Sequence, residues 1–277
     1  MAAAVAGTVR EALEGAMGAL EAAGVDGARL DAELLLAEAL GLDRARLAAD
    51  PRAGVPAQAA RRFGEMVRRR VAREPVAYIL GRKGFRHIEL AVDRRVLIPR
   101  PETELLVELA VELGPRSVLD VGTGSGAVAL AVAAELPQVT ATGVDTSPGA
   151  LAVARANAEW LGLAARVRIA ERTGGTWDLV LANLPYVPES DWDTLEPEIR
   201  GYEPREALIA GPTGLEAIDE LLGAISLGSP SAEVVGLEVG MGQAVAVAEL
   251  VRRAGFEQVE TRRDLAGIER MVVGRRP

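Results

Sequence analysis

Two short segments combine residue types and spacing that can carry group-transfer chemistry. The first is Asn183-Leu184-Pro185-Tyr186, which directly follows the strand-like segment WDLVLA at residues 177–182. The Asn183 side-chain oxygen and the Leu184 backbone carbonyl can each accept one N–H of a planar amide or amine nitrogen, while Tyr186 offers a flat wall. Two such acceptors aim the nitrogen at an electrophilic methyl group and stabilise the positive charge that develops, so no ionised base is required. We expect catalysis and substrate binding at Asn183, Leu184, Pro185 and Tyr186.

The second segment is the glycine-rich turn Gly122-Thr123-Gly124-Ser125-Gly126, which follows the strand-like segment VLDV at residues 118–121. Glycine is needed where the backbone turns with positive φ and where a ligand lies against bare backbone. Asp145 ends the next apolar run, and a carboxylate at this place can accept the two hydroxyls of a ribose. A tight strand–helix turn without a ligand, and an Asp that caps the helix beginning near Pro148, are the structural alternatives for these two features.

The spacing of the glycines favours one cofactor over another. A dinucleotide site usually has the turn G-x-G-x-x-G, whereas this turn is G-x-G-x-G and is preceded by Asp120. The form found here favours S-adenosylmethionine. We therefore expect this cofactor to contact Asn183, Asp145 and the turn residues Gly122, Thr123, Gly124, Ser125 and Gly126.

These side chains need a scaffold that brings them to one edge of a sheet. From residue 96 onward, strand-like apolar runs alternate with helical runs, which predicts an α/β fold with a doubly wound sheet over residues 96–277. The last part, residues 256–277, has no helix between its two strands and predicts an antiparallel hairpin at one edge of the sheet. In such a sheet, ligands bind outside the carboxyl ends of the strands near the switch point of the strand order. We expect both segments to lie there.

The chain before residue 96 has a different pattern. Leu30, Leu34 and Ala37 recur at helical spacing, and residues 1–74 are predicted to form a small N-terminal helical domain. Residues 75–95 contain short β-type runs separated by glycines, which predicts a β-hairpin linker rather than another helix.

Composition excludes several classes of function. The chain of 277 residues has no cysteine and His87 is its only histidine, so a thiol nucleophile, a disulfide framework and a zinc site of Cys and His are excluded, and no metal is expected. No apolar run reaches the roughly 18 residues of a membrane span, so we expect a cytoplasmic protein that does not act at membranes. The net charge is −9, and residues 1–100 carry 17 basic and 13 acidic side chains whereas residues 101–277 carry 14 and 27. The acidic part is a poor surface for nucleic acid.

Several segments resemble known families. DVGTGSGAVAL is similar to the first motif of class I methyltransferases, which have a Rossmann-like fold. NLPY resembles the N-P-P-Y box of enzymes that methylate amide or exocyclic amino nitrogens, with Leu184 in place of the first proline. Because Pro185 still restricts Leu184 to extended conformations, the carbonyl is expected to keep its position. Over nearly its full length the chain resembles bacterial release factor glutamine N5-methyltransferases, the HemK-like or PrmC family, in the segments REPVAYILGRKGF, VLIPRPETELLVE, YEPREALIAGPTGLE and LAGIERMVVGRR.

The resemblance implies an activity and a partner. A methyl group would pass from S-adenosylmethionine to the side-chain amide nitrogen, N5, of the glutamine in the Gly-Gly-Gln motif of peptide chain release factors, with no nucleic-acid substrate. The domain at residues 1–74 has none of the chemical motifs, and we expect it to recognise the release factor. Its arginine cluster at residues 61–73 is either part of that contact or a solvated helix face.

Three alternatives stay open at this point. A methyltransferase that acts on a glutamine of a ribosomal protein would have the same active site. An adenine-N6 nucleic-acid methyltransferase would want a basic cleft and a pocket for a flipped base. A scaffold that binds the cofactor without activity would follow if Leu184 disables the N-P-P-Y box.

Overall fold

The computed structural model describes residues 5–277, which divide into two compact units. The first unit contains the chain up to Gly81 together with Glu196–Tyr202, and the second contains Arg82–Leu195 and Glu203–Pro277. Each unit has a hydrophobic core of its own. Within the described residues, no helix combines the length and the apolar character that crossing a membrane requires.

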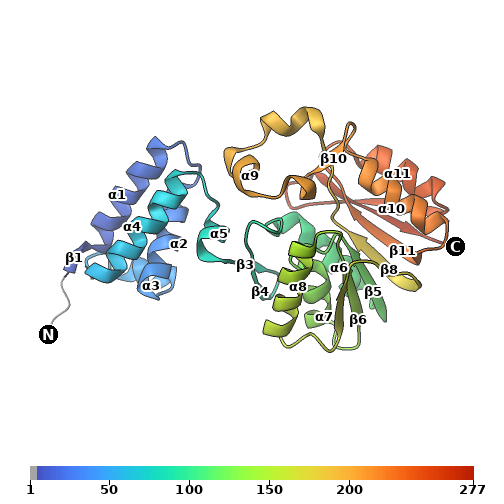
Figure 1. Cartoon of the computed structure of the whole chain (residues 1–277), viewed down its shortest axis with the longest axis horizontal. Coiled ribbons are helices and arrows are strands. Elements are labelled where there is room, and N and C mark those ends of the chain that lie inside the picture. Colours follow the sequence, from blue (N-terminus) through green and yellow to red (C-terminus); the bar gives the residue numbers. More distant parts are fainter. Residues whose placement is uncertain (1–4) are drawn as a thin grey trace. The chain divides into compact units, whose positions relative to one another are not determined.

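The first unit is mainly helical (Figure 1). Its core contains Leu20, Leu35 and Leu36, which are fully buried, and Phe63. These residues come from three different helices, which bury them against one another. The helices are α1 (Val9–Ala22), α2 (Ala28–Leu40), α3 (Arg44–Ala49), α4 (Ala57–Val71), α5 (Val76–Leu80) and α9 (Pro197–Tyr202), accompanied by the antiparallel strands β1 (Val5–Thr8) and β2 (Gly54–Pro56).

The segment expected as a hairpin linker, residues 75–95, begins with helix α5. Pro75, with a φ of −58°, precedes its first turn, and Gly81, with a left-handed φ of 72°, ends it. A short apolar run such as VAYIL is compatible with either a strand or a helix. The flanking Pro75 and Gly81 favour the helix. The hairpin follows as β3 (Arg82–Phe85) and β4 (Ile88–Ala91).

Part of the arginine cluster at residues 61–73 forms ion pairs within the first unit. Arg70 is buried, and its guanidinium donates to Asp31 at 2.7 Å and to Glu198 at 2.8 Å. Arg73 donates to the other carboxylate oxygen of Glu198 at 2.6 Å. Because a buried charge is costly unless it is paired, these contacts hold α9 to α2 and α4 within the first unit. Arg70 is therefore no surface residue for a partner.

The second unit contains a seven-stranded sheet of order β12-β13-β11-β8-β5-β6-β7. The five strands from β11 to β7 are parallel, and β13 is antiparallel to both of its neighbours. The predicted doubly wound sheet with an antiparallel hairpin at one edge is thus confirmed. The strands are β5 (Ser117–Val121), β6 (Thr140–Val144), β7 (Val167–Ala170), β8 (Thr176–Ala182), β11 (Ser231–Glu238), β12 (Gln258–Arg263) and β13 (Glu269–Arg275).

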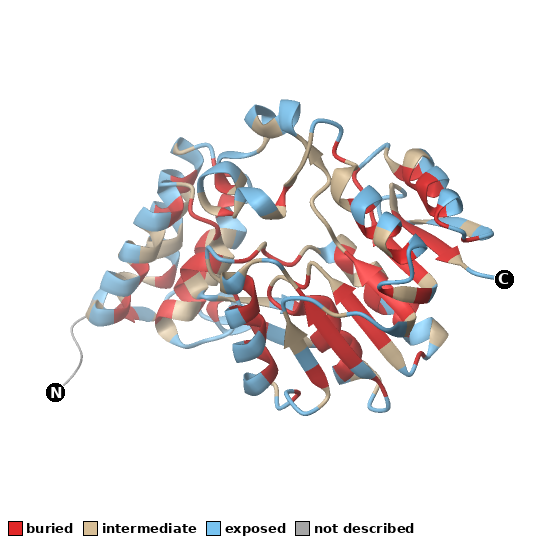
Figure 2. Ribbon diagram, turned by 45° about the vertical axis from the view of Figure 1, so that its right-hand side comes forward, coloured by how far each residue is buried: buried red, intermediate tan, exposed pale blue. Residues whose placement is uncertain are grey.

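Helices cover both faces of this sheet, and its strands are largely buried (Figure 2). In β8, Leu179 and Leu181 pack into the core beneath α6 and α7, whereas Val180 and Ala182 pack into the core beneath α10 and α11. Since successive strand residues point to opposite faces, this two-sided burial fixes the register of β8 and places Asn183 at its carboxyl end. The helices are α6 (Glu104–Leu113), α7 (Ala127–Glu135), α8 (Pro148–Trp160), α10 (Glu216–Ser226) and α11 (Ala244–Arg253).

Short elements in the connections complete the second unit. Two of them, β9 and β10, form a parallel pair after the carboxyl end of β8. Residues 101–103 form a single 3₁₀ turn that leads into α6. These elements are η1 (Pro101–Thr103), β9 (Val187–Pro188), η2 (Glu189–Thr194), η3 (Arg205–Ala207) and β10 (Ile209–Gly211).

Candidate active site

A cavity of about 840 Å³ lies at the carboxyl ends of β5, β6 and β8. Both segments that stand out in the sequence reach it, because β5 and β8 are adjacent parallel strands. Gly126 and Tyr186, which were also expected at the site, do not line the cavity. Of the predicted site residues, its lining includes Gly122, Thr123, Gly124, Ser125, Asp145, Asn183, Leu184 and Pro185.

The glycine-rich turn makes close approaches that a side chain would prevent. Gly122 has a φ of 74°, and a Cβ atom there would lie 2.9 Å from Cδ2 of Leu184 and 3.4 Å from the carbonyl oxygen of Asn183. Bare backbone at Gly122 therefore lets the two segments touch. Gly126 has a φ of 84° at the start of α7, and a Cβ atom would lie 2.8 Å from Cδ1 of Leu130. Gly126 thus allows helix α7 to pack closely.

Asp120 holds the glycine-rich turn in place through hydrogen bonds. It is 1% exposed, and its Oδ2 accepts hydrogen bonds from Thr123 Oγ1 at 2.6 Å and from the Ala129 amide at 3.1 Å. Burial raises the pKa of Asp120 to about 6, and the nearby Asp145 carboxylate adds to this rise. The hydrogen bonds from Thr123 and Ala129 oppose the shift because they favour the ionised form. The carboxylate ties the turn to the first turns of α7.

Asp145 joins the glycine turn to the start of α8. Its Oδ2 accepts a hydrogen bond from the Gly124 amide at 2.9 Å, and its Oδ1 accepts one from the Ser147 amide at 2.9 Å. Asp145 does not cap α8, the alternative that the sequence offered, because Ser147 is the N-cap and its hydroxyl accepts from the Ala150 amide at 3.3 Å. Asp145 also lines the cavity, and a carboxylate can accept more hydrogen bonds than these two. Structural and ligand-binding roles are therefore compatible at this residue.

The Asn183 side chain is held from one side only. Its Nδ2 donates to Thr103 Oγ1 at 2.9 Å, which leaves Oδ1 available to another donor. Thr103 is 4% exposed and belongs to the 3₁₀ turn before α6. The sequence pattern does not mark Thr103, because a threonine at a helix start is fully explained by its local position. Its contact with Asn183 joins residues far apart in the chain.

A second residue that the sequence reasoning missed supports the loop after Asn183. The side chain of Gln243 donates from Nε2 to the Tyr186 carbonyl at 2.9 Å and accepts from the Gly240 amide through Oε1 at 2.8 Å. Gln243 thereby links the loop after β8 to the loop after β11. No local pattern marks such a glutamine, although its position just after a parallel strand is the signal that could have found it.

Two further segments flank the cavity. Glu203 is buried, and it accepts from the Ile98 amide at 3.0 Å and from Arg100 Nη2 at 2.6 Å. This pairing connects the strand-like segment before η1 to the segment before η3. Residues from both segments line the cavity, among them Leu97, Pro99, Pro204 and Glu206.

Other walls of the cavity are formed by helix α10 and by the connection after β7. This connection contributes Glu171, Arg172, Thr173 and Gly174. A volume near 840 Å³ lies within the range of roughly 300–1,000 Å³ usual for ligand pockets. A carboxylate beside bare turn backbone suits the hydroxyls of a ribose, so the lining fits a ligand with a nucleoside part.

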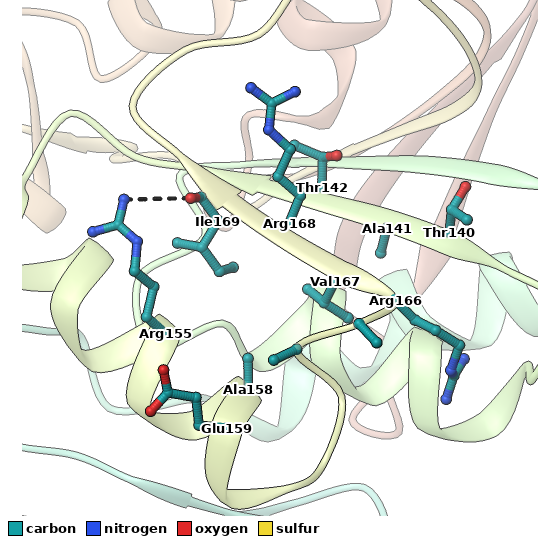
Figure 3. Close-up of a pocket in the computed structure, with 12 residues that line it drawn as sticks. Thr140, Ala141, Thr142, Arg155, Ala158, Glu159, Arg166, Val167, Arg168 and Ile169 are labelled. Atoms are coloured by element: carbon teal, nitrogen blue, oxygen red, sulfur yellow. Dashed lines mark hydrogen bonds between the residues drawn. The ribbon is translucent and has the colours of Figure 1, made fainter.

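A second cavity, of about 460 Å³, lies along β6, β7 and α8 (Figure 3). Arg155 of α8 donates to the Ile169 carbonyl at 3.3 Å across it. Arg155, Glu159 and Arg168 are exposed at its rim. The predicted site residues are all elsewhere, so this cavity has no part in the chemistry described above.

Comparisons with known proteins agree with this architecture. A family model described as the PrmC N-terminal domain matches residues 11–81, and one described as a methyltransferase domain matches residues 118–201. The solved structure of the hMettl16 catalytic domain in complex with a MAT2A 3′UTR hairpin has a TM-score of 0.56 at 15% identity, and the match covers 67% of this chain and 75% of that chain. At this identity the likeness concerns the fold alone, and it confirms the predicted class I methyltransferase fold.

Relatives of known name match over nearly the whole chain. The release factor glutamine methyltransferase of Caulobacter vibrioides is 41% identical over 96% of this chain and 96% of its own length. The protein of the same name from Geobacter sulfurreducens is 40% identical over 97% and 96%. The family that the motifs predicted is thereby confirmed: the chain belongs to the release factor glutamine methyltransferases.

Proposed function

We propose that this protein transfers a methyl group from S-adenosylmethionine to the side-chain amide nitrogen, N5, of the glutamine in the Gly-Gly-Gln motif of peptide chain release factors. The observation that carries the proposal is the position of Asn183 and Leu184 on the lining of the cavity, against the glycine turn. The names of the relatives support the same substrate.

The chain offers contacts that fit this cofactor. S-adenosylmethionine supplies a methyl group on a sulfonium ion, which is electrophilic without assistance from a metal. Asp145 is suited to accept the ribose hydroxyls, and Gly122 and Gly124 present bare backbone to the ligand. We assign cofactor binding to these residues and to Thr123 and Ser125, which line the same cavity.

Catalysis by the loop after β8 follows from the electronic structure of an amide. The lone pair of the glutamine nitrogen is delocalised into its carbonyl, so attack on a methyl group requires partial loss of that conjugation. In our proposal, Asn183 Oδ1 and the Leu184 carbonyl accept the two N–H groups and favour the reactive geometry. Pro185 and Tyr186 shape the loop. A positively charged product nitrogen is acidic, so its proton can leave to water.

Charge argues against the nucleic-acid alternative. Residues 101–277 carry 14 basic and 27 acidic side chains, and a protein that binds nucleic acid needs cations to neutralise phosphates. A glutamine in a protein loop places no such demand on the catalytic part.

The proposed activity is tested by incubating the protein with labelled S-adenosylmethionine and, separately, with release factor, ribosomes and DNA. We expect label in the release factor alone. Label in ribosomal protein or in DNA would instead select one of the alternative substrates, and no label in any of them would support a scaffold without activity.

We further propose that the first unit, residues 1–74 in particular, recognises the release factor. The family model for residues 11–81 supports its status as a domain, and the residues proposed for catalysis are all in the second unit. Arg61 and Arg68 are exposed on α4, two helical turns apart and therefore on one face. This face suits an acidic surface on the folded release factor.

Replacing both Arg61 and Arg68 with glutamate is therefore expected to lower kcat/KM for intact release factor by roughly tenfold or more at low ionic strength, because charge complementarity governs encounter. Activity on a short Gly-Gly-Gln peptide should stay unchanged. Steady-state kinetics on both substrates measure this difference. Arg10→Glu, an exposed substitution on α1, is the matched control. Equal kcat/KM values for the double variant and the control would place recognition elsewhere.

A further inference from the structure

One buried acidic residue near the proposed site has no role in the chemistry described so far. Glu238 is the last residue of β11 and is only 3% exposed. Its Oε2 is buried without a hydrogen-bond partner among the described residues. Carboxyl groups are rarely buried without a compensating interaction or a function, so the surroundings of Glu238 need an explanation.

Glu238 and Asn183 are connected through Thr103. The Thr103 hydroxyl accepts a hydrogen bond from Asn183 Nδ2 at 2.9 Å. The same hydroxyl is near enough to the Glu238 carboxyl to lower its pKa, although no hydrogen bond joins the two side chains in this structure. Thr103 is itself 4% exposed, so solvent cannot easily replace either neighbour. The three side chains come from separate elements, η1, β8 with its exit loop, and β11.

The hydrogen-bonding capacity of Glu238, Thr103 and Asn183 determines which way the Asn183 amide is turned. A hydroxyl has one proton to donate, and an ionised carboxylate can only accept. An ionised Glu238 can therefore only accept a hydrogen bond from the Thr103 hydroxyl, and Thr103 Oγ1 then accepts from Asn183 Nδ2, as it does in the structure. Because an amide carries its oxygen and nitrogen on opposite sides, Asn183 Oδ1 is then free for another donor.

When Glu238 is protonated, the direction of the hydrogen bonds among these three side chains is reversed. Glu238 can donate to Thr103 Oγ1, and the Thr103 proton is then free to donate to Asn183 Oδ1. The amide group of Asn183 would turn over and present Nδ2 in place of the oxygen. A donor in that position faces the N–H groups of the substrate amide and repels them.

We propose that Glu238 and Thr103 are positioning residues, which fix the side-chain amide of Asn183 so that its oxygen faces the nitrogen to be methylated. This inference rests on the proposed function, since it assigns a task to Asn183 in that reaction. Neither residue needs to touch the substrate.

The charges around Glu238 predict the pH at which the orientation of the Asn183 amide changes. Burial raises the pKa of Glu238 to about 7, and the Glu102 carboxylate adds to the rise. The hydroxyls of Thr103 and Tyr186 and the guanidinium of Arg270 act in the opposite direction. Glu238 is ionised above this pKa, so kcat should be highest in mildly alkaline solution and should fall as the pH drops through about 7.

The test compares three variants of the full chain in kcat, in KM for release factor and in affinity for S-adenosylmethionine. Thr103→Val keeps the shape but lacks the hydroxyl, and we expect its kcat to fall roughly tenfold or more with cofactor affinity within about threefold of the original. Thr103→Ser keeps the hydroxyl and should retain most of kcat. Glu238→Gln cannot ionise, so it should lose the fall in kcat near pH 7.

Folding stability gives a readout that does not depend on the substrate. A carboxyl whose pKa is raised in the folded state stabilises the fold at low pH, and this contribution is lost as the pH rises through about 7. Relative to Glu238→Gln, the unmodified protein should therefore become less stable to denaturant from acidic to mildly alkaline pH. The same result is expected whether or not release factor is the substrate.

Two results would overturn the inference. One is a Thr103→Val variant whose kcat stays within about threefold of the original. The other is a fall in kcat near pH 7 that persists in Glu238→Gln. Both require an active unmodified protein, so they are distinct from a failure of the proposed function, in which the unmodified protein itself leaves release factor unmethylated.

Discussion

Replacing Asn183 with alanine is expected to lower kcat by roughly 100-fold or more while the affinity for S-adenosylmethionine stays nearly unchanged. The alanine removes one of the two acceptors that stabilise the developing charge on the nitrogen. It leaves the Leu184 carbonyl, the glycine turn and Asp145 in place, so the cavity that would hold the cofactor keeps its walls.

Single-turnover kinetics on release factor measure the chemical step, and calorimetry measures cofactor affinity in the same variant. The unfolding temperature is the control for structural damage, because the substitution deletes the side-chain hydrogen bond that Asn183 makes to Thr103. A variant that turns over at a near-normal rate would contradict the assigned role. A parallel loss of cofactor affinity would make Asn183 chiefly a binding residue.

Gly122→Ala should reduce kcat/KM for S-adenosylmethionine by roughly 100-fold. A positive φ costs an L-residue about 1–2 kcal/mol, and the added Cβ would meet Leu184 Cδ2 at 2.9 Å. Relief of that contact moves either the cofactor turn or the loop that carries Asn183. The substitution therefore damages both halves of the proposed site at once.

Gly223→Ala is the matched control, because a Cβ there meets no atom within 4 Å and the residue lies inside helix α10. Its kcat/KM should equal that of the original chain. Steady-state kinetics at varied cofactor concentration, with circular dichroism to verify folding, compare the two variants. A Gly122→Ala variant that behaves like the control would show that the close approach at Gly122 does not matter for activity.

The sequence was sufficient for the features that depend on local pattern. The alternation of strand-like and helical runs from residue 96 onward predicted the sheet, and the position of Asn183 at the end of β8 follows from that order. The arginine cluster shows the limit of such patterns. Arg70 has the same helical surroundings in sequence as its exposed neighbours, yet it is buried because Glu198, far along the chain, comes to pair with it.

The contacts that orient the site could not be predicted in the same way. Thr103 and Gln243 support the loop after β8 from other elements, and each has an ordinary local explanation at its own position. Tyr186, in contrast, was expected at the site from its motif. Its motif predicted a wall of the site, but it does not line the cavity, and burial followed by the nearby Glu238 raises the pKa of Tyr186 to about 12.

The most direct test of the proposed activity is mass spectrometry of an unmethylated release factor before and after incubation with this protein and S-adenosylmethionine. We predict that the release factor gains the mass of one methyl substitution and that fragmentation assigns it to the glutamine of the Gly-Gly-Gln motif. An unchanged mass with active cofactor and folded protein, or a methyl group on any other residue, would contradict the proposed function.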